Sequence, residues 1–84
     1  MFSTPKQPST REVFAQNLRR ARRSKDISQE VLALEAGLQR GHLSRVERAA
    51  VNITFDTADE LARAIGVPLC ELVDPARLHG LDDQ

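Results

Sequence analysis

Residues 27–49 read ISQEVLALEAGLQRGHLSRVERA, and a glycine separates two short helical patterns in this stretch. Ser28 is a favourable N-cap for the first pattern, so a helix is predicted over residues 29–36. Gly37 follows, where helices commonly end in a left-handed conformation that glycine adopts without strain. The second pattern predicts a helix over residues 39–48. The stretch therefore predicts two helices joined by a tight turn.

The second of these helices has an outward face that the fold alone does not require. On a helical wheel, Leu43 and Val46 share one side and are expected to face the core. An arginine can donate two parallel hydrogen bonds to guanine in the major groove of DNA, and a glycine lets the backbone approach closely. The alternative is a solvated charged face with a glycine in a frayed first turn. The residues opposite the core side are Gly41, Ser44, Arg45 and Arg48, with Arg40 beside them.

The pairing of the two helices favours DNA contact over the solvated face. Two helices joined by a short glycine-containing turn form a geometry that places the second helix in the major groove. Gln29 begins the first helix, where its side chain and the helix N-terminus are expected to meet a phosphate. His42 flanks the contact face and is expected either to meet a phosphate when protonated or simply to be exposed.

The rest of the chain predicts three further helices. Ser9 and Glu12 fit a capping box, so a helix is predicted from there to about residue 25. A fourth helix is predicted over residues 55–65, and Pro68 suits the first turn of a short helix that ends near residue 73. The inner positions of the fourth helix are expected to be Phe55, Ala58, Leu61, Ala62 and Ile65.

Five helices without a convincing strand predict an all-α fold. Residues 1–8 contain two prolines and are interpreted as a flexible N-terminal arm. Residues 9–73 form the predicted helical domain, and residues 74–84 form a C-terminal tail.

Composition limits the classes of function. The chain has 84 residues and a single cysteine, Cys70, so no intramolecular disulfide can form. No apolar run approaches the roughly 18 residues of a membrane span, and no signal-peptide core is present, so a cytoplasmic location is predicted. No catalytic triad, phosphate loop or cluster of metal ligands is recognisable. Neither an enzyme nor a cofactor or metal site is therefore predicted. Cys70 is interpreted as a small core or interface residue.

Charge is divided unevenly along the chain, although the formal net charge is zero. Residues 1–48 contain ten Lys or Arg and five Asp or Glu, a net of +5, whereas residues 49–84 contain two and seven, a net of −5. A chain of this polarity can present a basic face to a nucleic acid. Uneven charge also occurs in small helical proteins that have no such partner.

The stretch over residues 27–49 resembles the core of the XRE family, the lambda-repressor-like helix-turn-helix regulators. The similarity continues in FDTADELARAIGVPLCEL, residues 55–72, which is similar to the fourth and fifth helices of the family. It implies a five-helix lambda-repressor-like DNA-binding domain with the helix-turn-helix in helices 2 and 3. The positions that carry the resemblance are Ser28-Gln29, Ala33, Gly37 and Leu43-Ser44-Arg45-Val46-Glu47.

The resemblance implies roles for the matching residues. Gln29 would contact a phosphate. Arg22 and Glu47 would form an ion pair that ties the first helix to the end of the third, with Arg22 also near a phosphate. The alternative is two independent surface charges, which contribute little. The residues that would meet base edges or flanking phosphates are Gln39, Arg40, Gly41, Ser44 and Arg45.

Several positions depart from the family pattern. Gly41 and His42 stand where Ser, Thr, Tyr or Gln are more usual, so the resemblance does not imply a particular base preference. Ala49 stands where the family usually has glycine, so a less sharp turn is expected after the third helix. Ala58 stands where leucine is common, so the nearby core is expected to rely on Phe55 for volume. NITFD, residues 52–56, is similar to the loop of small stand-alone members, which include the controller proteins of restriction–modification systems.

Apolar residues near the C-terminus exceed what one small core needs. They predict a homodimer interface built from the last helix and the tail, at Leu69, Leu72, Val73 and Leu78. The alternative is that Leu69 and Leu72 only cover the base of the core.

Taken together, these features predict a sequence-specific transcriptional regulator that binds double-stranded DNA as a homodimer on a palindromic operator. The alternative is an antitoxin or another protein-interaction module that binds a protein partner through the acidic C-terminal half. The two hypotheses are not exclusive, because antitoxins of this family also bind DNA.

Overall fold

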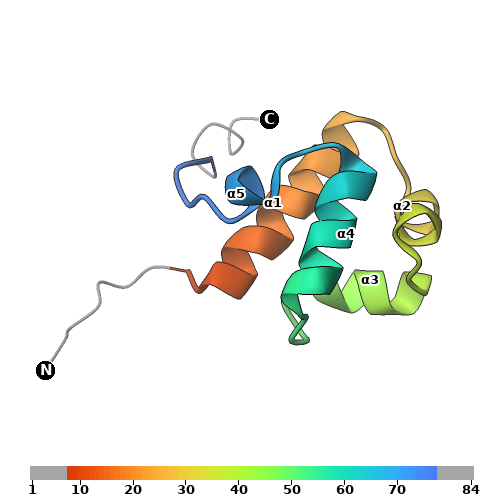
Figure 1. Cartoon of the computed structure of the whole chain (residues 1–84), viewed down its shortest axis with the longest axis horizontal. Helices are drawn as coiled ribbons and strands as arrows, with labels where there is room; N and C mark the ends of the chain where they lie inside the picture. The colour runs from red at the N-terminus through yellow and green to blue at the C-terminus, as the bar shows by residue number, and fades with distance from the viewer. Residues whose placement is uncertain (1–7, 78–84) are drawn as a thin grey trace, which may run out of the picture.

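The computed structural model describes residues 8–77 of the chain, and within this range every regular element is a helix. The helices follow one another in the order α1 (Thr10–Ser24), α2 (Gln29–Ala36), α3 (Arg40–Glu47), α4 (Phe55–Ile65) and α5 (Leu69–Leu72). Figure 1 shows α2 and α3 together at one end of the molecule, and α5 beside α1 at the other. The predicted all-α fold of five helices is confirmed.

The capping signals in the sequence lie where the helices begin. The side chain of Ser9 accepts a hydrogen bond from the Glu12 amide at 3.2 Å, while the Glu12 carboxylate accepts one from the Ser9 amide at 2.8 Å. Ser28 and Thr54 cap α2 and α4 in the same way, each through the amide three residues later. These bonds satisfy amides that have no partner within the helix. The predicted bounds of α2 and α4 match the structure.

Helices α3 and α5 differ slightly from the prediction. α3 begins one residue later and ends one residue earlier, because Gln39 and Arg48 have the non-helical dihedral angles of caps. Pro68 is the residue before α5 rather than part of its first turn, and Val73 is its C-cap.

The core lies between α1, α4 and the α2–α3 pair, and α5 covers its base. The side chain of Leu72 is 1% exposed and packs in this core. Leu72 was predicted at the dimer interface, and this prediction is corrected, because its side chain already fills the protomer's own interior. The largest fully buried side chains are Leu18, Leu32, Leu43, Leu61, Ile65 and Leu72.

The position of Phe55 also differs from the prediction, which placed this residue in the core beside Ala58. Its side chain is 88% exposed, whereas Ala58 is buried. Phe55 is the first residue of α4, and the neighbouring helices do not cover that end. The stripe at positions 58, 61, 62 and 65 fills the core without it.

Asn17 ties α1 to the end of α5. Its side-chain amide donates to the carbonyl oxygens of Leu72 at 3.1 Å, Asp74 at 3.2 Å and Glu71 at 3.4 Å. Asn17 itself is 3% exposed. This buried amide therefore joins α1 to the last turn of α5 and to the residues that follow it.

The turn after α3 is as tight as glycine would make it. Ala49 has a φ of +57°, in the left-handed region, and its amide donates to the Val46 carbonyl at 3.0 Å. The Ala50 amide donates to the Arg45 carbonyl at 2.9 Å. The expectation of a less sharp turn was wrong, because the surrounding structure holds alanine in a conformation that disfavours its Cβ.

Replacing Ala49 with glycine is expected to stabilise the fold by about 0.5–1 kcal/mol, since it relieves the left-handed strain. The melting temperature should rise by roughly 2–8 °C, which circular dichroism can measure. Gly37→Ala is the matched control, because Gly37 has a φ of +75° and a Cβ there would meet nothing within 4 Å. It should lower stability through backbone strain alone. A lower melting temperature for Ala49→Gly would contradict the assignment.

Among the described residues, no helix has the length and apolar character needed to cross a membrane.

Candidate nucleic-acid interface

The two faces of α3 differ sharply. Leu43 is 0% exposed and Val46 is 3% exposed, so both anchor the helix to the core as predicted. His42 and Ser44 are half-buried at the edges of the outer face. The residues that the structure leaves exposed on and beside α3 are Gln39, Arg40, Gly41, Arg45 and Arg48. The structure therefore places these predicted contact residues on one accessible helix.

A buried ion pair ties α1 to the end of α3. The Arg22 guanidinium donates to both carboxylate oxygens of Glu47, through Nε at 2.7 Å and Nη2 at 3.0 Å. Its Nη1 atom also donates to the Ile27 carbonyl at 2.8 Å. The two side chains are 11% and 1% exposed, so they are not independent surface charges. This fork-to-fork pairing is the strong geometry for arginine and a carboxylate.

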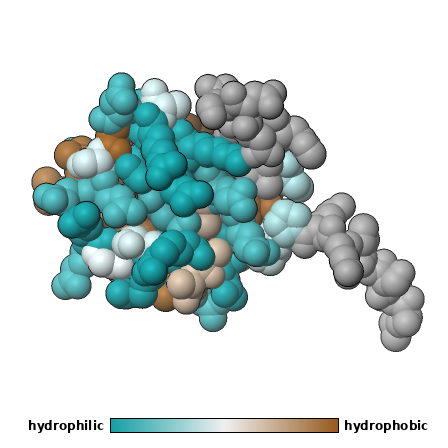
Figure 2. Space-filling view, turned by 180° about the vertical axis from the view of Figure 1, so that it is seen from behind, coloured by the Kyte–Doolittle hydropathy of each residue, from teal (hydrophilic) through white to brown (hydrophobic). Residues whose placement is uncertain are grey.

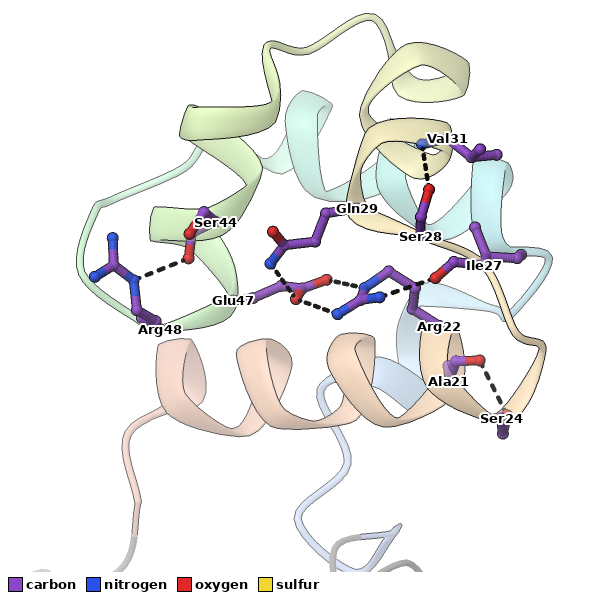
Figure 3. Close-up of polar contacts among 10 residues, drawn as sticks. All are labelled: Ala21, Arg22, Ser24, Ile27, Ser28, Gln29, Val31, Ser44, Glu47 and Arg48. Atoms are coloured by element: carbon purple, nitrogen blue, oxygen red, sulfur yellow. Dashed lines mark hydrogen bonds and ion pairs between the residues drawn. The ribbon is translucent and has the colours of Figure 1, made fainter.

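Gln29 completes the same network from α2. Its Nε2 donates to Oε1 of Glu47 at 3.0 Å, as Figure 3 shows, so one carboxylate joins α1, α2 and α3. The sequence indicated Gln29 only as a phosphate contact. Its contact with Glu47 spans 18 residues of chain, and no local pattern signals it. The network fixes the N-terminus of α2 against α3.

Two arginines on the outer face have weaker local contacts. Arg40 lies 4.0 Å from the Glu30 carboxylate, and both side chains are well exposed, at 65% and 75%. Such a surface pair contributes about 1 kcal/mol or less. Arg48 turns back along the helix, where its Nε donates to the Ser44 carbonyl at 3.3 Å. Both guanidiniums can therefore exchange these contacts for others.

Gly41 leaves a space on the outer face that the fold does not use. A Cβ built on it would have the terminal Nη1 of Arg45 as its nearest neighbour, at 3.8 Å, which is an ordinary contact. The packing of the free protein therefore gives no reason to exclude alanine at this position.

An apolar hollow lies between α1, α5 and the start of α4, and Val46 of α3 and residues 51–54 also line it. It has a volume of about 260 Å³, and we call it the apolar hollow. Leu69 and Val73, both predicted at a dimer interface, line it and are half-buried, whereas Leu78 lies outside the described residues. Its apolar lining also includes Phe14, Val51, Ile53 and Phe55.

Cys70 is exposed, so it is not a core residue. Within residues 8–77, no three His, Cys, Asp or Glu side chains are grouped so that they could bind a metal ion. The opposite side of the molecule from that in Figure 1 is largely hydrophilic, with small, separated apolar areas (Figure 2).

The comparisons with known proteins agree on one class. A helix-turn-helix family model matches residues 18–72. Control protein C.BamHI of Bacillus amyloliquefaciens is 38% identical over 65 residues, which cover 76% of this chain and 80% of that protein. A hypothetical transcription factor of Neisseria meningitidis is 39% identical over 71 residues, covering 84% of this chain and 67% of that protein. The solved structure of the restriction-modification controller protein C.AhdI from Aeromonas hydrophila superposes with a TM-score of 0.71 at 37% identity, covering 74% of this chain and 94% of that one.

Proposed function

Because this chain belongs to the helix-turn-helix family, as an XRE-type DNA-binding transcriptional regulator, we propose that it recognises a palindromic operator as a homodimer. The observation that carries the proposal is the two-sided character of α3. Leu43 and Val46 anchor its inner face, and its outer face presents guanidinium groups beside the N-terminus of α2. The relatives reported above are named as transcription factors or control proteins rather than as enzymes.

The outer residues of α3 divide between bases and phosphates. Arg45 is exposed in the middle of the helix and is suited to donate to a guanine edge in the major groove. Arg40 reaches the same groove from the first turn of α3, and Gln39 and Ser44 lie beside them. Arg48 and His42 stand at the margins of this face, where cationic or polar side chains meet the backbone of DNA.

Gln29 and Arg22 are assigned to positioning. Gln29 lies at the first turn of α2, whose N-terminal amides and positive dipole favour a phosphate. Its amide is oriented by Glu47, which Arg22 in turn fixes. Such contacts set the register of a protein on the duplex without selecting a sequence.

Replacing Gly41 with alanine is expected to change stability and DNA affinity in opposite directions. The fold should gain up to about 1 kcal/mol, because alanine favours a helix and its Cβ finds room. Duplex binding should weaken, because a methyl group intervenes where the backbone approaches DNA. A thermal melt and a duplex titration on the same variant measure both effects. Unchanged affinity would show that no close approach occurs at this residue.

The homodimer is proposed to form through the apolar hollow, with a second copy as the occupant. Phe55 is 88% exposed at the rim of this hollow, whose accessible lining is mainly apolar, with Thr10, Arg11, Asn52 and Thr54 as its polar members. An aromatic side chain beside an apolar depression is self-complementary across a two-fold axis, so each copy can bury the Phe55 of the other. Leu69 and Val73 belong to this surface.

Phe55→Ser is expected to weaken the homodimer by about 2 kcal/mol or more, or roughly 30-fold in dissociation constant, because a buried aromatic anchor is lost. Sedimentation equilibrium measures the change. The matched control is Leu34→Ser, since Leu34 is 80% exposed on α2, away from the hollow. If Phe55→Ser left the dimer intact, the interface would lie elsewhere. The same would follow if Leu34→Ser weakened the dimer as much as Phe55→Ser does.

The experiment that tests the function is selection of bound duplexes from a random pool at about 150 mM salt. The expected result is a palindrome with half-site centres roughly 10 bp apart, because two copies of α3 then enter successive major grooves. Retention without any recovered motif, lost as salt rises, would indicate binding to phosphates alone and would sink the proposal.

We further propose that the chain is a small regulator of the controller type. Its likeness to C.BamHI and C.AhdI, over most of the length of each, supports this assignment. The interaction module that uses the acidic half stays a prediction. Within the described part of that half, Asp59 and Glu71 are already paired with Arg63 and Arg77. The division into a domain over residues 9–73, an arm before it and a tail after it also stays a prediction, and residues 1–7 and 78–84 lie outside the described part of the chain.

A further inference from the structure

A second hollow, polar in character, lies between α1 and the end of α3. It has a volume of about 250 Å³, room for several water molecules of roughly 30 Å³ each. From α1 it is lined by positions 12, 15, 16 and 19, which follow helical spacing along one stripe. From α3 and the residues after it come positions 47 to 49. We call this the α1–α3 hollow.

Two guanidinium groups border the α1–α3 hollow. The Nε atom of Arg19 is fully buried and has no hydrogen-bond partner among the described residues. Leaving a buried donor of this kind without an acceptor is unfavourable, so such groups call for a partner. Arg48 borders the hollow from the other side, with one hydrogen bond to the Ser44 carbonyl. Arg19 therefore carries a donor that the fold does not use, next to the hollow but closed off from solvent in the free protein.

The carboxylates of the α1–α3 hollow are already bound. Glu47 accepts from Arg22 and Gln29, and its side chain is 1% exposed. Glu12 accepts from the Ser9 amide in the capping box. The charges of Arg22 and Glu47 cancel each other. The remaining charged groups are Arg19, Arg48 and Glu12, so the hollow has a net charge of about +1. An anion is therefore the ligand that this charge balance favours.

The hollow lies at the edge of the surface proposed to face DNA. Arg48 continues the outer face of α3, three residues after Arg45. Figure 3 shows Arg48 on the side of α3 away from Gln29. The major groove is about 12 Å wide, close to the diameter of a helix with its side chains, so a helix in the groove has a phosphate backbone on either side. Gln29 is assigned to one of these backbones, and the α1–α3 hollow borders the opposite side.

We propose that the α1–α3 hollow binds a backbone phosphate of the DNA, with Arg19 as the main donor and Arg48 beside it. The proposal rests on the proposed function and adds α1 to the contact surface. Arg19 contacts no base in this arrangement, so it contributes affinity and register but no sequence preference. Because that Nε is closed off from solvent in the free protein, the Arg19 side chain must turn toward the hollow as DNA binds, and Nε can then donate to a phosphate oxygen.

The test is the salt dependence of duplex binding by Arg19→Gln, on the duplex recovered by selection and on one of unrelated sequence. Each phosphate contact contributes about 0.9 to the slope of log affinity against log salt. The slope should fall in magnitude by about one per protomer on both duplexes, with affinity roughly 8-fold weaker per protomer at about 0.1 M salt. Base preference should not change.

Arg63→Gln is the matched control, because it removes the same charge from an exposed arginine on α4 that pairs with Asp59. Its slope should stay close to that of the wild type. Arg19→Lys keeps the charge, so it should keep the slope while binding more weakly. Thermal melts verify that each variant is folded.

Neutralising single phosphates as methylphosphonates gives a second, independent measurement. At one position of the duplex, neutralising the phosphate should weaken binding by the wild type and by Arg63→Gln. The same replacement should leave binding by Arg19→Gln unchanged. An Arg19→Gln slope equal to that of Arg63→Gln, or a changed base preference, would overturn the phosphate site alone. Failure of the wild type to bind any duplex would overturn the proposed function together with it.

Discussion

Replacing Arg22 with methionine is expected to destabilise the fold by about 3–5 kcal/mol, because it leaves the Glu47 carboxylate buried without its cation. Glu47 is 1% exposed, so water cannot replace the two hydrogen bonds that it loses. Gln29 alone would remain as a donor. A domain of this size is commonly stable by about 5–15 kcal/mol, so the loss is a large part of the whole. Urea unfolding followed by circular dichroism measures the free energy of unfolding.

A second substitution separates the buried charge from the lost packing. The double variant Arg22→Met with Glu47→Leu removes both charges and should recover much of the loss, because apolar side chains can replace a buried ion pair at little cost. Arg63→Met is the surface control. Its partner Asp59 is 48% exposed, so the change should be about 1 kcal/mol or less. If Arg22→Met were as mild as Arg63→Met, the network would not stabilise the domain.

Arg45→Ala is expected to cost about 1–3 kcal/mol of specific binding in each half-site, the usual contribution of a good contact to one base. A homodimer loses it twice, so affinity for the operator should fall by about 30-fold to 10⁴-fold. On an operator in which the contacted base pair has been changed, the wild type and Arg45→Ala should bind with equal affinity. The wild type has then lost the contact that the variant lacks. Competition titrations with operator duplexes altered at single positions measure this.

Gln29→Ala provides the contrast for Arg45→Ala. Removing Gln29 should weaken binding to all duplexes alike, because its proposed partner is a phosphate. Arg45→Ala should instead flatten the preference at one position of each half-site. If both variants bound more weakly but kept the full preference of the wild type, bases would be recognised by other residues of α3.

The helices of this fold could be predicted from the sequence because their ends are set by local chemistry. Ser9 with Glu12, Ser28 and Thr54 each act within three residues of the chain. The apolar stripes also indicated the inner faces of α3 and α4. Phe55 could not be placed this way, because helical spacing identifies a face but not how far the neighbouring helices extend along it.

The long-range polar contacts could not be derived from local pattern. The Arg22–Glu47 pair was expected only through resemblance to a family, and the Gln29 contact with Glu47 was missed. Asn17 carried no signal, because its three acceptors lie 54 to 57 residues further along the chain. The left-handed conformation of Ala49 was missed because the local signal pointed the wrong way. Residue preference argues against it locally, and the packing around the turn enforces it.

The hydrogen bonds that Asn17 donates to the end of α5 limit how early in synthesis this protein can finish folding. During synthesis, which adds about 5–20 residues per second, the first helix is made several seconds before the last. Until residues 71–74 leave the ribosome, the buried amide of Asn17 has no acceptors and the base of the core stays open. A nascent chain that stops short of α5 therefore lacks both a closed core and the surface proposed for pairing. Emergence of residues 71–74 from the ribosome is therefore the step that allows the domain to close and become active.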